Sequence, residues 1–253
     1  MKIYIEDSYE KISEKAALMV ASRIIANPKS VLGLATGSTP IGMYKKLIDM
    51  YRKNIIDFSR ITTFNLDEYY KLPKEDKGSY YYYMMQTFFN HINISKENIH
   101  IPNGMADDIE KECREYEKKI EKAGGIDIQV LGIGTNGHIG FNEPTENLNT
   151  KTSLIDLKEN TIEDNSRFFE KKEDMPTKAI SMGIASIMKA KRVVLLASGE
   201  NKAQAIRDMT NGYINTNHPA SILQAHRDCI LIIDKDAAKL ILCQGDVSGG
   251  RGF

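Results

Sequence analysis

The chain has 253 residues, of which 42% are hydrophobic, and this is enough apolar material for a sizeable core. Its 34 basic and 34 acidic side chains balance, so charge gives no reason to expect nucleic acid or an anionic membrane as a partner. No apolar run approaches the about 20 residues that span a bilayer, and the start, MKIYIEDSYEKI, has no signal-peptide core. The three cysteines show no CxxC-type spacing, which favours reduced, buried thiols. We therefore expect a cytoplasmic protein.

Strands and helices are predicted to alternate along the chain. A helix is expected over residues 8–26, where apolar side chains recur on one stripe, and buried strands are expected over 31–35 and 61–66. Further strands are expected at 126–134, 191–199 and 229–234, and further helices at 41–51, 79–91, 106–123 and from about 201. This order predicts an α/β fold, Rossmann-like and three-layered, whose open, mostly parallel sheet has helices on both faces. No linker is evident, so 1–253 is expected to be a single domain.

Residues 142–176 differ from the rest of the chain. They are polar, with few apolar positions and two prolines. Unstructured stretches of this length are usually functional or mobile. We interpret the segment as a long excursion that acts as a lid over a site.

A candidate anion site follows the strand predicted at 31–35. Gly37 allows a tight turn, Thr36, Ser38 and Thr39 supply hydroxyl groups, and Pro40 suits the first position of a helix. Free N–H groups and the helix dipole favour an anion there. The Gly-Lys-Ser/Thr ending of a nucleotide P-loop is missing. The alternative is an ordinary helix cap made by a serine or threonine.

Two basic residues are further candidates for binding a phosphate. Lys202 lies in SGENKAQA, at the predicted start of a helix, where a lysine can deliver a point charge. The alternative is a solvated helix lysine. Arg167, in NSRFF, has a guanidinium group whose shape suits phosphate.

The run from Gly132 to Gly137 matches GxGxxG and follows a strand, as in dinucleotide-binding proteins. The required helix does not follow, because HIGFNEPTENLN contains a proline and several asparagines. We expect no dinucleotide cofactor. The glycines are expected to let the backbone approach a small substrate.

Two adjacent carboxylates, Asp67 and Glu68, come directly after the strand predicted at 61–66. In a strand they point in different directions, so one can face a site while the other has a structural partner. Desolvation raises the pKa of a carboxylate and makes it a better base near neutral pH. The alternative is a solvated pair in a turn.

A second polar group follows the strand predicted at 126–134. His138 is followed five residues later by Glu143, and an imidazole–carboxylate pair of this kind can orient the ring and stabilise its charged form. Asn136 and Asn142 lie beside them in the sequence. The other histidines show no HxxxH spacing and no GxSxG elbow occurs, so we expect neither a metal site nor a serine hydrolase.

Taken in order, VLGLATGSTP, TFNLDEYY, GIGTNGHIGFNEP, NSRFF and SGENKA resemble glucosamine-6-phosphate deaminases over nearly the whole chain. The resemblance implies an aldose–ketose isomerisation and deamination of a sugar phosphate, without cofactor or metal. It implies that Asp67 moves a proton between C2 and C1, and that His138 helps to open the sugar ring with support from Glu143 and Asn136. The implied phosphate contacts are Thr36, Gly37, Ser38, Thr39, Arg167 and Lys202.

The chain departs from the family pattern in two places. Some members carry aspartate where this chain has Asn136, and asparagine cannot carry a charge, so we expect His138 and Glu143 to form the working pair. Hexameric, allosterically activated members carry basic residues where residues 152–155 here read TSLI. A monomer is therefore expected, with a homo-oligomer as the alternative.

Two other functions compete with this interpretation. A 6-phosphogluconolactonase-type hydrolase has a related fold and a GxGxDGH-like segment, but is not expected to keep the acid of NLDEY or the FNEP sequence. A non-catalytic sugar-phosphate sensor would need the phosphate loop but neither Asp67 nor His138.

Overall fold

Seven parallel strands form the main sheet of the computed structural model, within the residues that the structure describes, 1–166, 169 and 174–242. In spatial order they are β1 (Lys2–Glu6), β10 (Cys229–Asp234), β9 (Arg192–Ala197), β6 (Ile128–Leu131), β2 (Val31–Leu34), β3 (Thr62–Asn65) and β5 (Ile99–His100). The central strands are nearly continuous apolar runs because helices cover both of their faces. The predicted α/β class with an open parallel sheet is confirmed.

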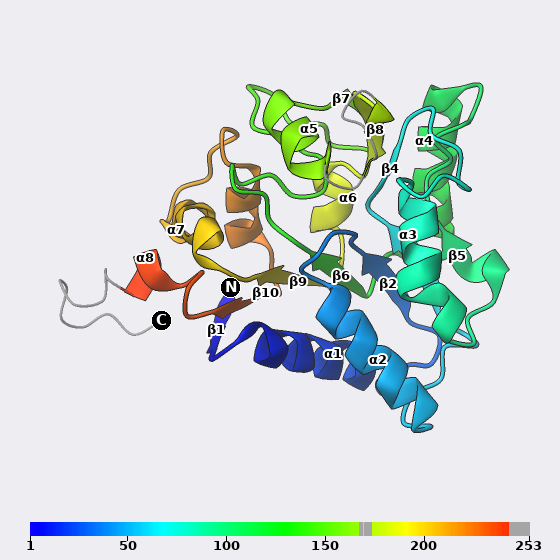
Figure 1. The fold of residues 1–253 in the computed structure, drawn as a ribbon, viewed down its shortest axis with the longest axis horizontal. Coiled ribbons are helices and arrows are strands. Elements are labelled where there is room, and N and C mark those ends of the chain that lie inside the picture. Colours follow the sequence, from blue (N-terminus) through cyan, green and yellow to red (C-terminus); the bar gives the residue numbers. More distant parts are fainter. Residues whose placement is uncertain (167–168, 170–173, 243–253) are drawn as a thin grey trace.

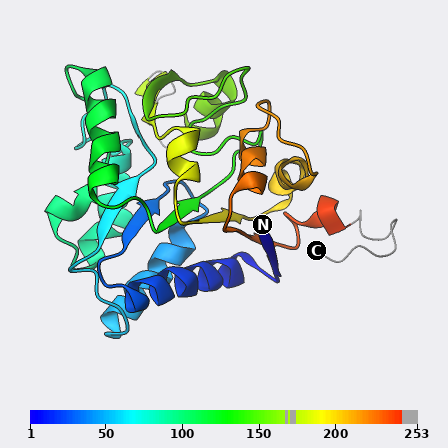
Figure 2. The same ribbon diagram turned by 180° about the vertical axis from the view of Figure 1, so that it is seen from behind.

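Helices pack on both faces of this sheet. The α-helices are α1 (Tyr9–Ala26), α2 (Ile41–Arg52), α3 (Tyr80–Thr87), α4 (Ile109–Lys122), α5 (Glu159–Ser166), α6 (Ile184–Met188), α7 (Ala203–Thr210) and α8 (Lys239–Leu242). Short 3-10 helices are η1 (Phe89–His91), η2 (Lys96–Asn98), η4 (Glu200–Lys202) and η5 (Pro219–Ala225). Figures 1 and 2 show α1 and α2 below the sheet, and α4, α6 and α7 above it. Each layer contributes to its own hydrophobic cluster.

Helix α1 illustrates how the local sequence determines an element. Ser8 caps its N-terminus by accepting a hydrogen bond from the backbone N–H of Lys11. The buried stripe predicted from the sequence packs against the sheet and includes Ile12, Ala16, Val20 and Ile24. The helix therefore covers residues 9–26, as the apolar spacing predicted.

A small antiparallel sheet lies above the carboxyl edge of the main sheet. Its strands are β4 (Asp67–Tyr69), β8 (Lys178–Ser181) and β7 (Ser153–Asp156). Strand β7 and helix α5 belong to residues 142–176, so the described part of this segment contains regular secondary structure that the sequence did not indicate. Within its described residues, β7 pairs with β8, and Leu157 and Ile162 pack into a separate apolar cluster with Tyr69 and Phe141. Figure 1 places α5, β7 and β8 together at the top of the molecule.

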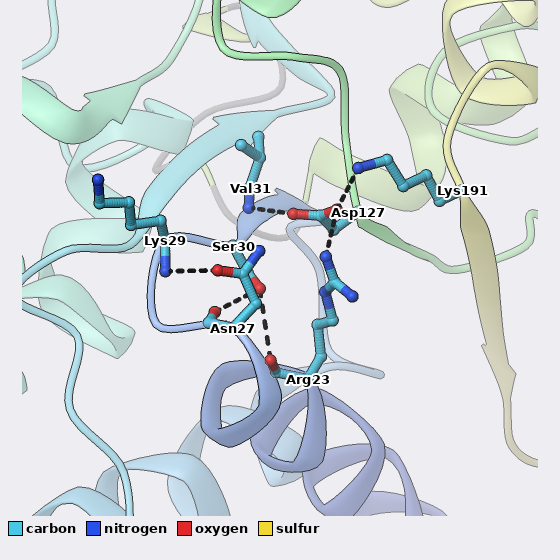
Figure 3. Close-up of polar contacts among 7 residues, drawn as sticks. All are labelled: Arg23, Asn27, Lys29, Ser30, Val31, Asp127 and Lys191. Carbon is cyan, nitrogen blue, oxygen red and sulfur yellow. Dashed lines mark hydrogen bonds and ion pairs between the residues drawn. The ribbon is translucent and has the colours of Figure 1, made fainter.

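A polar cluster closes the opposite, amino edge of the main sheet (Figure 3). The carboxylate of Asp127 accepts hydrogen bonds from Arg23 of α1 at 2.6 Å, from Lys191 at 2.8 Å and from the backbone N–H of Val31 at 2.8 Å. Burial raises the pKa of Asp127, but these bonds and the two positive charges hold it below its ordinary value. The cluster ties α1 to the starts of β2 and β6.

Candidate active site

The loops that follow β9, β6, β2 and β3 carry the residues singled out from the sequence. These four strands are neighbours and parallel, so their carboxyl ends lie side by side at one edge. The phosphate loop at 36–40, the loop at 132–143 and Lys202 in η4 all emerge at this edge. Arg167 lies outside the described residues.

Asp67 stands where the chain passes from the main sheet into the small one. The preceding residue, Leu66, donates its backbone N–H to Leu34 of β2, and its carbonyl accepts from Met182 beyond β8. Asp67 itself pairs with Ser181 in the small sheet. The backbone on both sides of the acid is therefore fixed by hydrogen bonds to two different sheets.

The Asp67 carboxylate is buried without compensation. It is 5% exposed, and the described part of the chain offers it neither an ion-pair partner nor a hydrogen bond. Burial, together with the charge of Glu68, raises its pKa to about 8. A carboxylate with this pKa is suited to accept and return a proton near neutral pH.

The neighbouring acid, Glu68, points the other way and caps helix α3. Its carboxylate accepts hydrogen bonds from the backbone N–H groups of Tyr69, Tyr80 and Tyr81, at 2.8, 2.9 and 2.8 Å. Burial raises its pKa to about 7, against the lowering effect of these three N–H groups. Glu68 thus anchors α3, while Asp67 is left to face the site.

His138, Asn136 and Glu143 form one hydrogen-bonded group. Nδ1 of His138 lies 2.8 Å from Oδ1 of Asn136 and 3.5 Å from Oε2 of Glu143, and the Asn136 amide donates to the same Glu143 oxygen at 2.8 Å. Burial raises the pKa of Glu143, but the hydrogen bond and charge of His138 and the bonds from Thr161 and Asn136 bring it below the ordinary value. The glutamate is therefore held as an anion behind the imidazole.

Gly140 brings this loop against Asp67. A methyl group added at Gly140 would lie 3.6 Å from Oδ2 of Asp67 and 3.2 Å from Oγ of Ser181. Gly140 has a φ of +59°, and the N–H of Phe141 next to it donates to Ser181 Oγ at 3.0 Å. The structure thus places the Asp67 carboxylate and the loop that carries His138 beside one another.

The glycines of the GxGxxG match accommodate histidine rings. A methyl group at Gly134 would lie 2.3 Å from the ring of His138, and one at Gly137 would lie 2.2 Å from the ring of His218. Gly137 also has a φ of +84°. Strand β6 is followed by this loop and then by β7, not by the helix that a dinucleotide site requires.

The candidate phosphate loop, residues 36–40, is held in place by tyrosine hydroxyl groups. Tyr83 donates to the carbonyl of Gly37 at 2.5 Å, and the hydroxyl of Tyr9 lies within 3.1 Å of the carbonyls of Ser38 and Thr39. Gly37 has a φ of +91°, as its turn requires. Helix α2 starts at Ile41 and not at Pro40, which is instead the N-cap residue and makes no side-chain cap. The alternative of an ordinary serine or threonine cap is therefore not what the structure contains.

Sequence reasoning did not single out Tyr80 or Thr161. Tyr80 stacks on Phe141 with ring centroids 5.8 Å apart, is hydrogen-bonded with Thr36 and feels the charge of Asp67, so it connects the phosphate loop to both acid-bearing segments. The run of four tyrosines at 80–83, within the helix predicted at 79–91, was an available signal. Thr161 donates to Glu143, and no local pattern indicated this contact.

In the described ranges there is no group of three or more His, Cys, Asp or Glu side chains that could hold a metal ion. None of the described helices is both long and apolar enough to cross a membrane.

The sequence and the fold were compared with those of known proteins. Residues 5–232 match the family described as glucosamine-6-phosphate isomerases/6-phosphogluconolactonase. The chain is 64% identical over 241 residues to a glucosamine-6-phosphate deaminase of Alkaliphilus oremlandii, covering 95% of this chain and 100% of the relative. It is 62% identical to a glucosamine-6-phosphate deaminase of Clostridium botulinum strain Loch Maree, covering 94% of this chain and 98% of that one.

Solved structures agree. A monomeric glucosamine-6-phosphate deaminase superimposes with a TM-score of 0.92 at 45% identity, covering 95% of this chain and 100% of the other. The 6-phosphogluconolactonase of Thermotoga maritima shares the fold, with a TM-score of 0.73 at 21% identity over 92% of this chain and 99% of its own. The chain belongs to the glucosamine-6-phosphate isomerase and 6-phosphogluconolactonase family.

Proposed function

We propose that this protein is a glucosamine-6-phosphate deaminase, which converts glucosamine 6-phosphate and water into fructose 6-phosphate and ammonia. The observation that carries the proposal is that the buried carboxylate of Asp67, which no described residue pairs with, lies beside the loop that holds the His138–Glu143 pair. Glucosamine-6-phosphate deaminases of other organisms are 60–64% identical to this chain and are covered almost completely by it.

Asp67 is the proposed base of the isomerisation. The open-chain sugar loses a proton from C2 to the carboxylate, and the proton is returned at C1, which moves the unsaturation from C1 to C2. A glutamate serves the same purpose in triosephosphate isomerase. Because the pKa of Asp67 is about 8, giving the proton back costs little at neutral pH.

His138 is the proposed group that opens the sugar ring, by moving a proton between the ring oxygen and the C1 hydroxyl. Glu143 and Asn136 hold its Nδ1 side, which leaves the opposite nitrogen available to the sugar. After isomerisation the nitrogen is bonded to C2 as an imine. Water adds to C2 and ammonia leaves, so that the atoms balance without a metal or organic cofactor.

The phosphate group is proposed to bind at the loop 36–39. Its hydroxyl groups and backbone lie before the N-terminus of α2, where the helix dipole favours an anion. Lys202, on the loop after β9, and Arg167, outside the described residues, are the proposed cationic contacts. The segment 142–176 is proposed to act as the lid, since α5 within it contacts Glu143 directly.

The direct test is an assay of purified protein with glucosamine 6-phosphate, measuring released ammonia and fructose 6-phosphate in equal amounts. The same preparation is tested with 6-phosphogluconolactone, because the family includes lactonases. We expect stoichiometric ammonia and no lactone hydrolysis above background. Lactone hydrolysis without ammonia release would reverse the assignment, and binding of the sugar phosphate without turnover would favour a sensor.

We further propose that the chain acts as a cytoplasmic monomer. The monomeric glucosamine-6-phosphate deaminase of known structure, 45% identical to this chain, supports this proposal. Cys113 and Cys229 are buried free thiols, and burial raises their pKa values to about 11 and about 12, which keeps them protonated and inert. Light scattering on the purified protein should give the mass of one chain, and a mass of several chains would contradict the monomer.

A further inference from the structure

The two carboxylate oxygens of Glu143 have different partners. Oε2 faces the ring-opening group, since it accepts from the Asn136 amide and lies 3.5 Å from Nδ1 of His138. Oε1 accepts a hydrogen bond from the hydroxyl of Thr161. One oxygen therefore belongs to the loop after β6, while the other is bonded to a residue 18 positions further along the chain.

Thr161 lies in the first turn of α5, within the segment 142–176. Its side chain is 2% exposed although the helix around it is largely polar. A second contact joins the same parts, because Lys158, just before α5, donates to the carbonyl of Pro144, the residue after Glu143. The start of α5 is thus bonded to the loop after β6 at two points, the side chain of Glu143 and the backbone carbonyl of Pro144.

We propose that Thr161 is a positioning residue, which couples the seating of α5 over the site to the orientation and charge of Glu143 behind His138. The proposal rests on the deaminase function proposed above. When α5 is packed against the loop after β6, the hydroxyl of Thr161 donates to Oε1 of Glu143, and this bond orients Oε2 of Glu143 toward the imidazole of His138. The acid behind the imidazole is then completed by the segment that covers the site, so that a proton is moved efficiently only when the site is covered.

The charge on Glu143 depends on the groups around it. His138 is the titratable side chain that faces it from the same loop, and Asn136 and Thr161 supply neutral donors. On the α5 side, Lys158 is bonded to the Pro144 carbonyl, and Glu159 and Glu163 are exposed. A donor to a carboxylate stabilises the ionised form, so removal of the Thr161 hydroxyl raises the pKa of Glu143. The acidic limb of kcat/KM then moves to higher pH.

The test compares Thr161→Val, which removes only the hydroxyl at nearly constant shape, with Thr161→Ser, which keeps it. We expect Val to lower kcat about tenfold, the effect of losing one hydrogen bond to a charged group, with KM changed less. The acidic limb of its pH profile shifts upward, while Ser stays close to the parent protein. Thr161→Ala against Thr161→Ser gives the same comparison if the valine variant does not fold.

Thr152→Val is the matched control. Its hydroxyl, in the same segment, donates to Glu117 of α4 at 2.6 Å, so this variant loosens the segment without touching Glu143. We expect its pH profile to match that of the parent. A shift of equal size in both valine variants, or no shift in Thr161→Val, would overturn the proposal.

A second readout needs no turnover. Carbon-13 NMR titration of the Glu143 carboxylate in the substrate-free protein should show a higher pKa in Thr161→Val than in the parent or in Thr152→Val. If the parent protein released no ammonia but this difference appeared, the proposed function would fail while the contact and its electrostatic effect stood. An unchanged titration would show that Thr161 does not act on Glu143.

Discussion

Asp127 and Asp67 are both buried aspartates beside strands of the main sheet, but they lie at opposite edges and have opposite properties. Each is 5% exposed. At the amino edge, two cations and a backbone N–H surround Asp127 and hold its pKa low (Figure 3). At the carboxyl edge, the charged group that acts on Asp67 among the described residues is another acid, Glu68, and burial together with this charge raises the pKa of Asp67 to about 8. Burial therefore gives a structural anion where it is compensated and a proton acceptor where it is not.

The largest expected effect is a loss of activity when Asp67, the aspartate at the carboxyl edge, is substituted. Asp67→Asn keeps the shape of the side chain but removes the base, so ammonia release should fall on the order of 10³-fold or more. Asp127→Asn should retain the parent kcat, because its partners lie at the other edge of the sheet. Both are measured as ammonia release at saturating glucosamine 6-phosphate. Comparable activity in Asp67→Asn and the parent would remove the assigned base.

Stability should respond to the same two substitutions with opposite signs. The folded pKa of Asp67 is raised, so ionisation opposes folding as pH rises from about 4 to about 8. Near pH 8 the free energy of unfolding of Asp67→Asn should therefore exceed that of the parent by a few kcal/mol, since each unit of pKa difference corresponds to about 1.4 kcal/mol. This gain in stability should vanish as the pH falls below about 4, where Asp67 becomes protonated in both states.

The folded pKa of Asp127 is lowered, so its contribution is present above the unfolded value near 4 and is lost as pH falls through the folded one. Its partners are partly solvated, with Arg23 33% and Lys191 55% exposed, so Asp127→Asn should cost about 1–2 kcal/mol at pH 7. Urea unfolding at pH 4, 6 and 8 measures both variants. If both substitutions changed the free energy of unfolding in the same direction at pH 8, the proposed difference between the two aspartates would be wrong.

The smallest expected effect concerns Asn136, whose side chain is hydrogen-bonded to both His138 and Glu143. Asn136→Asp would place a second carboxylate 2.8 Å from Oε2 of Glu143, where the amide now donates. Like charges raise the pKa of the pair, so the acidic limb of kcat/KM should move to higher pH with less than about a tenfold change in kcat. A pH profile of kcat/KM identical to that of the parent would contradict this expected repulsion between the two carboxylates.

The sequence predicted the parts of the fold that follow from local patterns. The buried strands β2, β6 and β10 are nearly continuous apolar runs, and α1 carries a regular apolar stripe, so the strands and the helix could be located from the sequence pattern alone. The small sheet could not, because β4 has three residues and β7 and β8 have four, and their partners are distant in the chain. Their order comes from tertiary pairing and from a third apolar cluster.

Some residues of the candidate site could likewise be identified from local sequence patterns, and others could not. Residues directly after predicted strands, Asp67 and His138, were found because ligands of parallel sheets bind at that edge. The pairing of Glu143 with His138 was predicted from their spacing in the sequence, and the supporting place of Asn136 was implied by the family resemblance. Thr161 could not be found, since its contact depends on how a polar helix folds back over the sheet.

Strand β4 is only three residues long, yet its register decides which of two acids, Asp67 or Glu68, faces the candidate site. A shift of one residue between Leu66 and β8 would turn every side chain of the strand to the other face. Glu68 would then enter the site and Asp67 would be directed at α3. The chain would still present one acid to each side, but the one in the site would be a methylene group longer. The two backbone bonds of Leu66, to different sheets, thus set the reach of the base to within a single carbon–carbon bond.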